Sequence, residues 1–89
     1  MTKKRKEKQP ELVALGREIR RRRYDMGYSQ ADFAHELHLN RPYYGGIERG
    51  ERNLSVLNLT RIAIGLNASL TELLSGFDEQ FVKKYIKKR

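Results

Sequence analysis

The side chains with acid–base or metal-binding chemistry do not form a catalytic set in this sequence. His35 and Glu36 are adjacent in a predicted helix and so face different ways, and His38 has no carboxylate or thiol at metal-ligand spacing. The chain has no cysteine, which excludes thiol nucleophiles, thiolate zinc sites and disulfides. A chain of 89 residues can close one core but hardly a deep pocket as well. We therefore expect a protein that is not an enzyme and has no metal, cofactor or small-molecule ligand.

The distribution of charge favours a polyanionic partner instead. The formal net charge is +8, yet the excess lies in two segments: residues 1–9 have five basic residues and one acidic residue, and residues 83–89 have five basic residues and no acidic one. Residues 10–82 then have a net charge of −1. Basic segments of this kind bind nucleic acid or anionic membranes, and the alternative is that they only keep the protein soluble.

Apolar residues recur every three or four positions between residues 10 and 76, as in amphipathic helices. A first helix is expected from Pro10 to about Met26, ended by Gly27. Four more are expected after residues whose side chains cap helices: Ser29, Asn40, Ser55 and Ser69. The inner faces of the first four are expected to hold Leu12, Leu15, Ile19, Met26, Phe33, Ala34, Leu37, Tyr44, Ile47, Leu57, Ile62, Ala63 and Leu66.

The chain is therefore expected to be all-α, because no run alternates with period two and no hairpin signal occurs. Residues 10–76 are predicted to form one compact five-helix bundle. Residues 1–9 are predicted to be a disordered basic tail, since they are rich in like charge and poor in apolar residues. Residues 77–89 are predicted to form either a sixth helix or a second basic tail.

The second and third predicted helices are short and are separated by about three residues, which is the pattern of a helix-turn-helix. Ala34 is small where the two helices should cross most closely. The apolar residues around it have the spacing that lets two crossed helices share one core: Phe33, Leu37, Leu39, Tyr44 and Ile47.

Three segments have a closer resemblance to a known family: Leu15-Gly16-x-x-Ile19, Gly27-x-Ser29-Gln30-x-x-x-Ala34, and the run from Ile47 to Asn53. They resemble the Cro/phage-repressor (Xre) helix-turn-helix family, over about residues 15–74. Within that family, residues 41–53 with Asn58 and Leu59 are most similar to controller proteins of restriction–modification systems. The resemblance implies a lambda-repressor-like fold and a homodimer that binds a pseudo-palindromic operator.

The resemblance also implies which residues read bases. Arg41, Pro42, Tyr43 and Gly46 match the positions of the recognition helix that face the major groove. Arg41 is expected to be the principal reader, because a guanidinium can donate two hydrogen bonds to guanine; contact with phosphate alone is the alternative. Tyr43 is expected to contact a thymine methyl or a phosphate, or only to pack on the surface. Gly45 and Gly46 cost the helix roughly 1 kcal/mol each relative to alanine. A close approach of the helix backbone to DNA would be one gain, and a tolerated weakness that tertiary packing offsets is the alternative.

A second group is expected to contact the DNA backbone. Gln30 matches the family's phosphate-contacting glutamine at the start of the second helix. Arg52 and Asn53 lie in the loop after the recognition helix, where phosphate contacts are expected. Arg49 is expected either to contact phosphate or to be a solvent-facing cation at the helix end.

Two further sets have structural roles in this interpretation. Arg23 and Glu48 match an ion pair of the family and are expected to orient the recognition helix. The dimer interface is expected to involve an apolar face left over by the helix-turn-helix, although some of its residues must complete the core. That face comprises Ile64, Leu66, Leu70, Leu73 and Leu74.

We therefore expect a cytoplasmic, sequence-specific regulator that binds double-stranded DNA as a homodimer and blocks or recruits RNA polymerase. An antitoxin-type repressor that also binds a protein toxin is the first alternative. A protein that lies on a membrane surface through residues 81–89 is the second, since no apolar run is long enough to span a bilayer.

Overall fold

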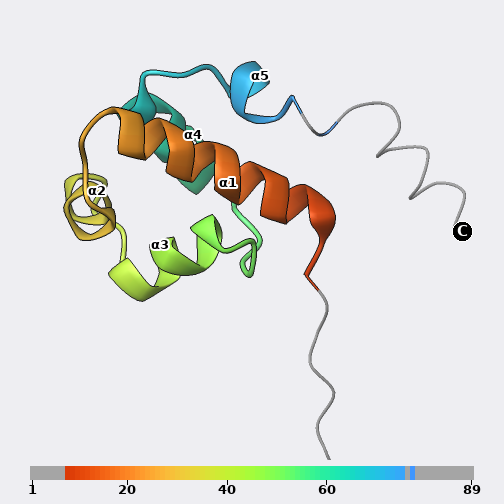
Figure 1. The fold of residues 1–89 in the computed structure, drawn as a ribbon, viewed down its shortest axis with the longest axis horizontal. Helices are drawn as coiled ribbons and strands as arrows, with labels where there is room; N and C mark the ends of the chain where they lie inside the picture. The colour runs from red at the N-terminus through yellow and green to blue at the C-terminus, as the bar shows by residue number, and fades with distance from the viewer. Residues whose placement is uncertain (1–7, 76, 78–89) are drawn as a thin grey trace, which may run out of the picture.

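The computed structural model describes residues 8–75 and 77, which form five α-helices and no strand (Figure 1). The helices are α1 (Pro10–Asp25), α2 (Gln30–Glu36), α3 (Arg41–Glu48), α4 (Val56–Leu66) and α5 (Leu70–Leu73). The expected five-helix, all-α fold is thereby confirmed. The sixth helix expected after residue 76 and most of the expected N-terminal tail lie outside the described residues.

The long helix α1 organises the bundle. It packs against α3, α4 and α5, while α2 packs against α3 and α5 against α4. In Figure 1, α4 lies behind α1, α2 and α3 lie on one side of it, and α5 lies on the other. α2 and α3 thus lie next to each other, away from α5.

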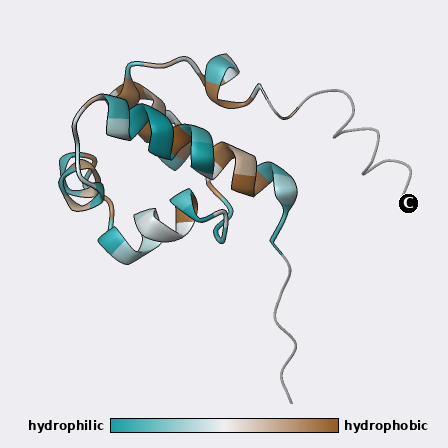
Figure 2. Ribbon diagram, in the orientation of Figure 1, coloured by the Kyte–Doolittle hydropathy of each residue, from teal (hydrophilic) through white to brown (hydrophobic). Residues whose placement is uncertain are grey.

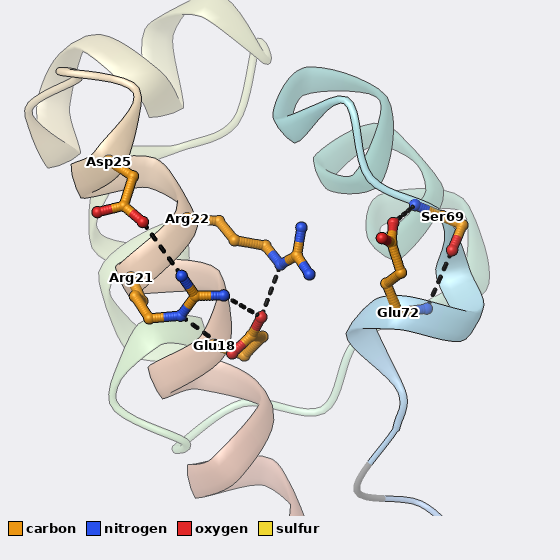
Figure 3. Close-up of polar contacts among 6 residues, drawn as sticks. All are labelled: Glu18, Arg21, Arg22, Asp25, Ser69 and Glu72. Atoms are coloured by element: carbon orange, nitrogen blue, oxygen red, sulfur yellow. Dashed lines mark hydrogen bonds and ion pairs between the residues drawn. The ribbon is translucent and has the colours of Figure 1, made fainter.

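All four expected capping side chains cap their helices. Ser29, Asn40, Ser55 and Ser69 each accept a hydrogen bond from the backbone N–H three residues further on, at 2.9–3.0 Å. At α5 the cap is reciprocal, because the Glu72 carboxylate also accepts from the backbone N–H of Ser69 at 2.8 Å (Figure 3). These bonds satisfy donors that a helix start leaves without intrahelical partners, and they fix where α2 to α5 begin.

Two helix ends show how tightly the chain turns. α2 is followed by His38 in the left-handed region at φ 57°, where a glycine is the usual residue. The residue after the C-cap of α3 is Gly50, with φ 75°. A Cβ at Gly50 would lie only 2.6 Å from the Val13 Cα of α1, so this glycine also permits close packing between the two helices.

The core is built mainly from the inner faces that the apolar spacing predicts. Its buried side chains are Leu15, Ile19, Phe33, Ala34, Leu37, Tyr44, Ile47, Leu59, Ile62, Ala63, Leu66 and Leu73. Phe33 and Tyr44 are fully buried and pack edge to face, with 5.6 Å between ring centroids. The C-terminal half of α1 is strongly polar, since residues 20–23 are all arginine (Figure 2), although Arg23 is buried.

Two expected core residues are wrong, and a third, Leu12, is only half-buried. Met26 is 47% exposed because α1 ends at Asp25, so this residue lies beyond the last turn that faces the core. Leu57 is 78% exposed, and Leu59 fills the corresponding core position. Leu59, Ile62 and Leu66 share one face of α4, and a residue two positions before Leu59 points away from that face.

Candidate nucleic-acid interface

α2 and α3 form the helix-turn-helix that the sequence predicts. Ala34 is fully buried at their junction, and its carbonyl accepts a hydrogen bond from the Leu39 N–H in the turn, at 2.9 Å. The later residues of α3, from Tyr44 to Glu48, are buried, whereas its first residues, Arg41 and Pro42, are exposed. α3 therefore presents its N-terminal turn to solvent.

Arg41 lies at the exposed start of α3. It is the first residue of α3, directly after the Asn40 cap, and the first turn has no acidic residue. Among residues 8–75 and 77, no hydrogen bond or ion pair engages its side chain. Its guanidinium is therefore available to an external acceptor.

Tyr43 is half-buried and has partners on two sides. The Arg52 guanidinium lies over its ring, 5.7 Å from the centroid, which is within the usual range of a cation–π contact. Its hydroxyl accepts a hydrogen bond from Asn58 Nδ2 of α4 at 3.1 Å. Asn58 thus positions a candidate contact residue, a role that spacing alone did not suggest.

Gly46, which was expected to face the groove, is covered by a side chain of the loop after α3. This residue is buried rather than open toward a groove, because the Arg52 side chain lies against it. A Cβ at Gly46 would be 2.9 Å from Arg52 Cγ. At Gly45, a Cβ would be 3.1 Å from Arg49 Nη1 and 3.2 Å from Gln30 Oε1. Both glycines therefore lie beneath side chains of the predicted phosphate-contacting group.

The side chains predicted to contact phosphate are partly engaged in contacts within the chain. Gln30 is half-buried, and its Nε2 donates to Glu48 Oε1 at 3.1 Å, which occupies one of its two N–H groups. Arg49 is exposed and pairs with Glu51 at 3.1 Å, and Lys8 approaches the same carboxylate at 3.5 Å. Asn53 is exposed, and nothing in the described part of the chain bonds to its side chain.

Glu48 joins the three helices around the site. Its carboxylate accepts hydrogen bonds from Arg23 Nε at 2.7 Å, from Arg23 Nη2 at 3.1 Å, and from Tyr44 Oη. Arg23 Nη1 also donates to the Tyr28 carbonyl at 2.7 Å. The side chains of Arg23 and Glu48 are 8% and 2% exposed, so the ion pair is buried. It connects α1 to α3, and the bond from Gln30 adds α2.

The protonation states at this cluster follow from its contacts. Burial raises the pKa of Glu48, but the hydrogen bonds from Arg23, Tyr44 and Gln30 outweigh it and hold the pKa below its ordinary value of 4.5. Burial, together with the Glu48 carboxylate, raises the pKa of the Tyr44 hydroxyl. At neutral pH the cluster therefore holds an ionised carboxylate among donors from three residues.

Two arginines on the outside of α1, Arg21 and Arg22, pair with acidic residues of the same helix. Arg21 bonds to Glu18 at 2.7 Å and to Asp25 at 3.1 Å, and Arg22 bonds to Glu18 at 2.6 Å (Figure 3). These hydrogen bonds lower the pKa of Glu18. Figure 3 also shows the Arg22 side chain between Glu18 and Glu72 of α5. This part of the positive charge is used within the fold, away from α3.

The residues expected at a dimer interface divide into two sets. Leu66 and Leu73 are buried in the chain's own core and have no surface left for a partner. Ile64 is 74% exposed, Leu70 is at the margin of exposure, and Leu74 is half-buried. The apolar surface available to a second copy therefore lies on the outer side of α4 and on α5.

Comparison with known proteins places this geometry in a family. A family profile described as "Helix-turn-helix" matches residues 19–73. The control protein C.MunI of Mycoplasma sp is 39% identical over 64 residues, covering 72% of this chain and 84% of the relative.

Solved structures agree with that match. The restriction–modification controller protein C.AhdI from Aeromonas hydrophila has a TM-score of 0.70 at 38% identity, covering 73% of this chain and 98% of that one. The controller C.Esp1396I, solved as a tetramer with its natural 35 base-pair operator, has a TM-score of 0.66 at 33% identity, covering 75% and 88%. The chain therefore belongs to the Xre-like helix-turn-helix family, and its relatives include controller proteins of restriction–modification systems.

Proposed function

We propose that this protein is a transcription regulator that binds a specific double-stranded DNA sequence by inserting the start of α3 into the major groove. The observation that carries the proposal is the contrast within α3: its body is buried and tied to α1 and α2 through Glu48, while Arg41 and Pro42 are exposed. A rigid helix that presents an uncommitted guanidinium at its first turn suits direct readout of guanine.

The surroundings of α3 supply the backbone contacts in this proposal. Gln30 lies beside the C-terminal half of α3 and keeps one amide N–H for a phosphate oxygen, and Arg49, Arg52 and Asn53 follow the C-terminal end of α3. Phosphate contacts beside a helix fix its register in the groove, whereas base contacts determine the sequence. Pro42 has no N–H to donate, so it contributes shape rather than a hydrogen bond.

We propose that the protein acts as a homodimer on a pseudo-palindromic operator. One short helix reads few base pairs, and a two-fold dimer places a second helix about 34 Å away, one turn along the duplex. The exposed side chains of Ile64 and Leu70, with Leu74, offer the apolar surface for such a dimer. Leu57 on the outer side of α4 is added to that surface because it is exposed.

The relatives favour a controller of restriction–modification genes. Occupancy of an operator by the dimer would block or recruit RNA polymerase, without any chemical step. Within residues 8–75 and 77, no helix is long and apolar enough to cross a membrane. We place the action of the protein in the cytoplasm, on DNA.

Selection of bound duplexes from a random pool, followed by sequencing, tests this proposal. The expected result is a motif with two inverted half-sites, bound by two copies of the chain as measured by native mass spectrometry. Failure to enrich any sequence would contradict specific recognition. Co-purification of a small toxin from the native host would favour the antitoxin interpretation over the controller.

A further inference from the structure

We infer that Gly46 and Asn58 are positioning residues that hold Arg52 and Tyr43 together as one preassembled contact unit beside the recognition helix. The inference rests on the proposed function, since the unit would act on DNA. It gives the second glycine of α3 a purpose other than close approach of the helix backbone to the groove.

The space above Gly46 is filled by Arg52. This arginine lies in the loop after α3, and its side chain packs against the helix at Gly46. An added Cβ would be 2.9 Å from Arg52 Cγ and 3.5 Å from Arg52 Nε. Real Cβ atoms do not approach so closely, so any larger residue at position 46 displaces the arginine.

The far end of Arg52 rests on an aromatic ring. With the stem of the arginine held against Gly46, its guanidinium lies over the Tyr43 ring, 5.7 Å from the centroid. A cation–π contact uses none of the arginine's N–H donors, and no hydrogen bond within the described residues engages them. A loop arginine that would otherwise sample many rotamers is thus held near the exposed first turn of α3.

The Tyr43 ring is itself anchored by another helix. Asn58 Nδ2 donates to Tyr43 Oη at 3.1 Å, so α4 fixes the platform on which Arg52 rests. The Asn58 backbone N–H is bonded separately to the Ser55 cap, so the side chain can be changed without loss of that cap. Preorganisation of this kind raises affinity by reducing the ordering that binding would otherwise require.

The test is a double-mutant cycle with the best duplex selected by the wild type. Arg52→Ala should weaken binding by about tenfold, the usual scale for removal of one side chain that touches DNA. Gly46→Ala should weaken binding to a similar extent although it improves helix propensity and leaves the melting temperature unchanged or higher. The double variant Gly46→Ala/Arg52→Ala should bind as Arg52→Ala does, because the alanine methyl then meets no arginine.

Two outcomes would overturn the inference. If Gly46→Ala binds as tightly as the wild type, the position of Arg52 does not depend on this glycine. If the double variant is weaker than Arg52→Ala by the full effect of Gly46→Ala, the methyl obstructs DNA directly. The effects of Asn58→Ala and Tyr43→Phe on binding should also be non-additive, because each change removes the same hydrogen bond, the one between Asn58 Nδ2 and Tyr43 Oη.

A measurement without DNA separates this inference from the proposed function. In NMR spectra of the free protein, the Arg52 Nε–Hε signal should be shifted upfield by the Tyr43 ring, and Gly46→Ala should abolish the shift. Absence of that shift in the wild type would refute the preassembled unit even if the protein binds its operator. Conversely, if the wild type shows the upfield shift but the selection enriches no DNA sequence, the proposed function is refuted and the preassembled unit is not.

Discussion

Replacement of Glu48 by glutamine is the sharpest test of how the fold positions α3. The carboxylate is 2% exposed and accepts from Arg23, Tyr44 and Gln30. A glutamine of the same shape keeps one acceptor oxygen but turns an NH2 group toward these donors. It also leaves the buried Arg23 guanidinium without a counter-charge.

The expected cost follows from the contacts that remain. Removal of one partner of a buried ion pair costs about 3–5 kcal/mol. Arg23 retains its hydrogen bond to the Tyr28 carbonyl and is 8% exposed, which favours the lower end, about 3 kcal/mol. For a domain of this size, that corresponds to a fall in melting temperature of roughly 12–24 °C.

Thermal unfolding followed by circular dichroism at pH 7 measures this fall. Protein concentration must be fixed, because dimerisation makes the melting temperature depend on it. Glu51→Gln is the matched control, since it removes an exposed carboxylate paired with Arg49 and should change the melting temperature little. If Glu48→Gln melts within about 3 °C of the wild type, the Glu48 cluster does not hold α3 in place.

Four further perturbations probe stability, dimerisation and DNA binding. The folded-state pKa of Glu48 lies below 4.5, so its contribution to stability is complete above that pH and is lost as the pH falls through the lower, folded-state pKa. Urea titrations at several pH values should therefore show the free energies of unfolding of the wild type and Glu48→Gln converging only below about pH 4.5. Ile64→Lys should yield a folded monomer in analytical ultracentrifugation, whereas Leu66→Ala should lower the free energy of unfolding by about 2–5 kcal/mol; an Ile64→Lys variant that remains dimeric would exclude that surface. Asn40→Ala should cost about 1 kcal/mol through loss of the α3 cap, measured by urea denaturation, and no loss would mean that water replaces the cap. Deletion of residues 1–7 should reduce the salt dependence of DNA binding without changing the selected sequence. The steepness of log binding constant against log salt concentration should fall by about 0.9 for each phosphate that the segment neutralises. An unchanged slope would show that this segment does not touch DNA.

Local signals predicted most of the fold. The capping residues Ser29, Asn40, Ser55 and Ser69 mark the helix starts because a cap depends on atoms only three residues apart. Apolar spacing predicted the inner faces because residues three or four positions apart lie on the same face of a helix. It placed Met26 and Leu57 wrongly, because spacing does not determine where a helix ends or which rotation of it faces the core.

The site was predictable as a set of residues but not as a set of contacts. Arg41 is placed by a cap and a helix start, which the sequence contains. The Arg52 side chain covers Gly46 through a reversal of the chain after α3, and Asn58 reaches Tyr43 from another helix. Contacts of that kind depend on how separate elements pack, so the spacing of residues along the chain could not indicate them.

We propose that the first turn of α3 reads the DNA sequence. A comparison of the DNA motifs selected by the wild type and by Arg41→Ala tests this directly. Both proteins are incubated with the same random duplex pool, and the bound sequences are aligned on their two-fold axis. We expect Arg41→Ala to lose the preference for guanine at one symmetric pair of positions, while the spacing of the half-sites and the other preferences persist. An unchanged motif for Arg41→Ala would contradict the claim.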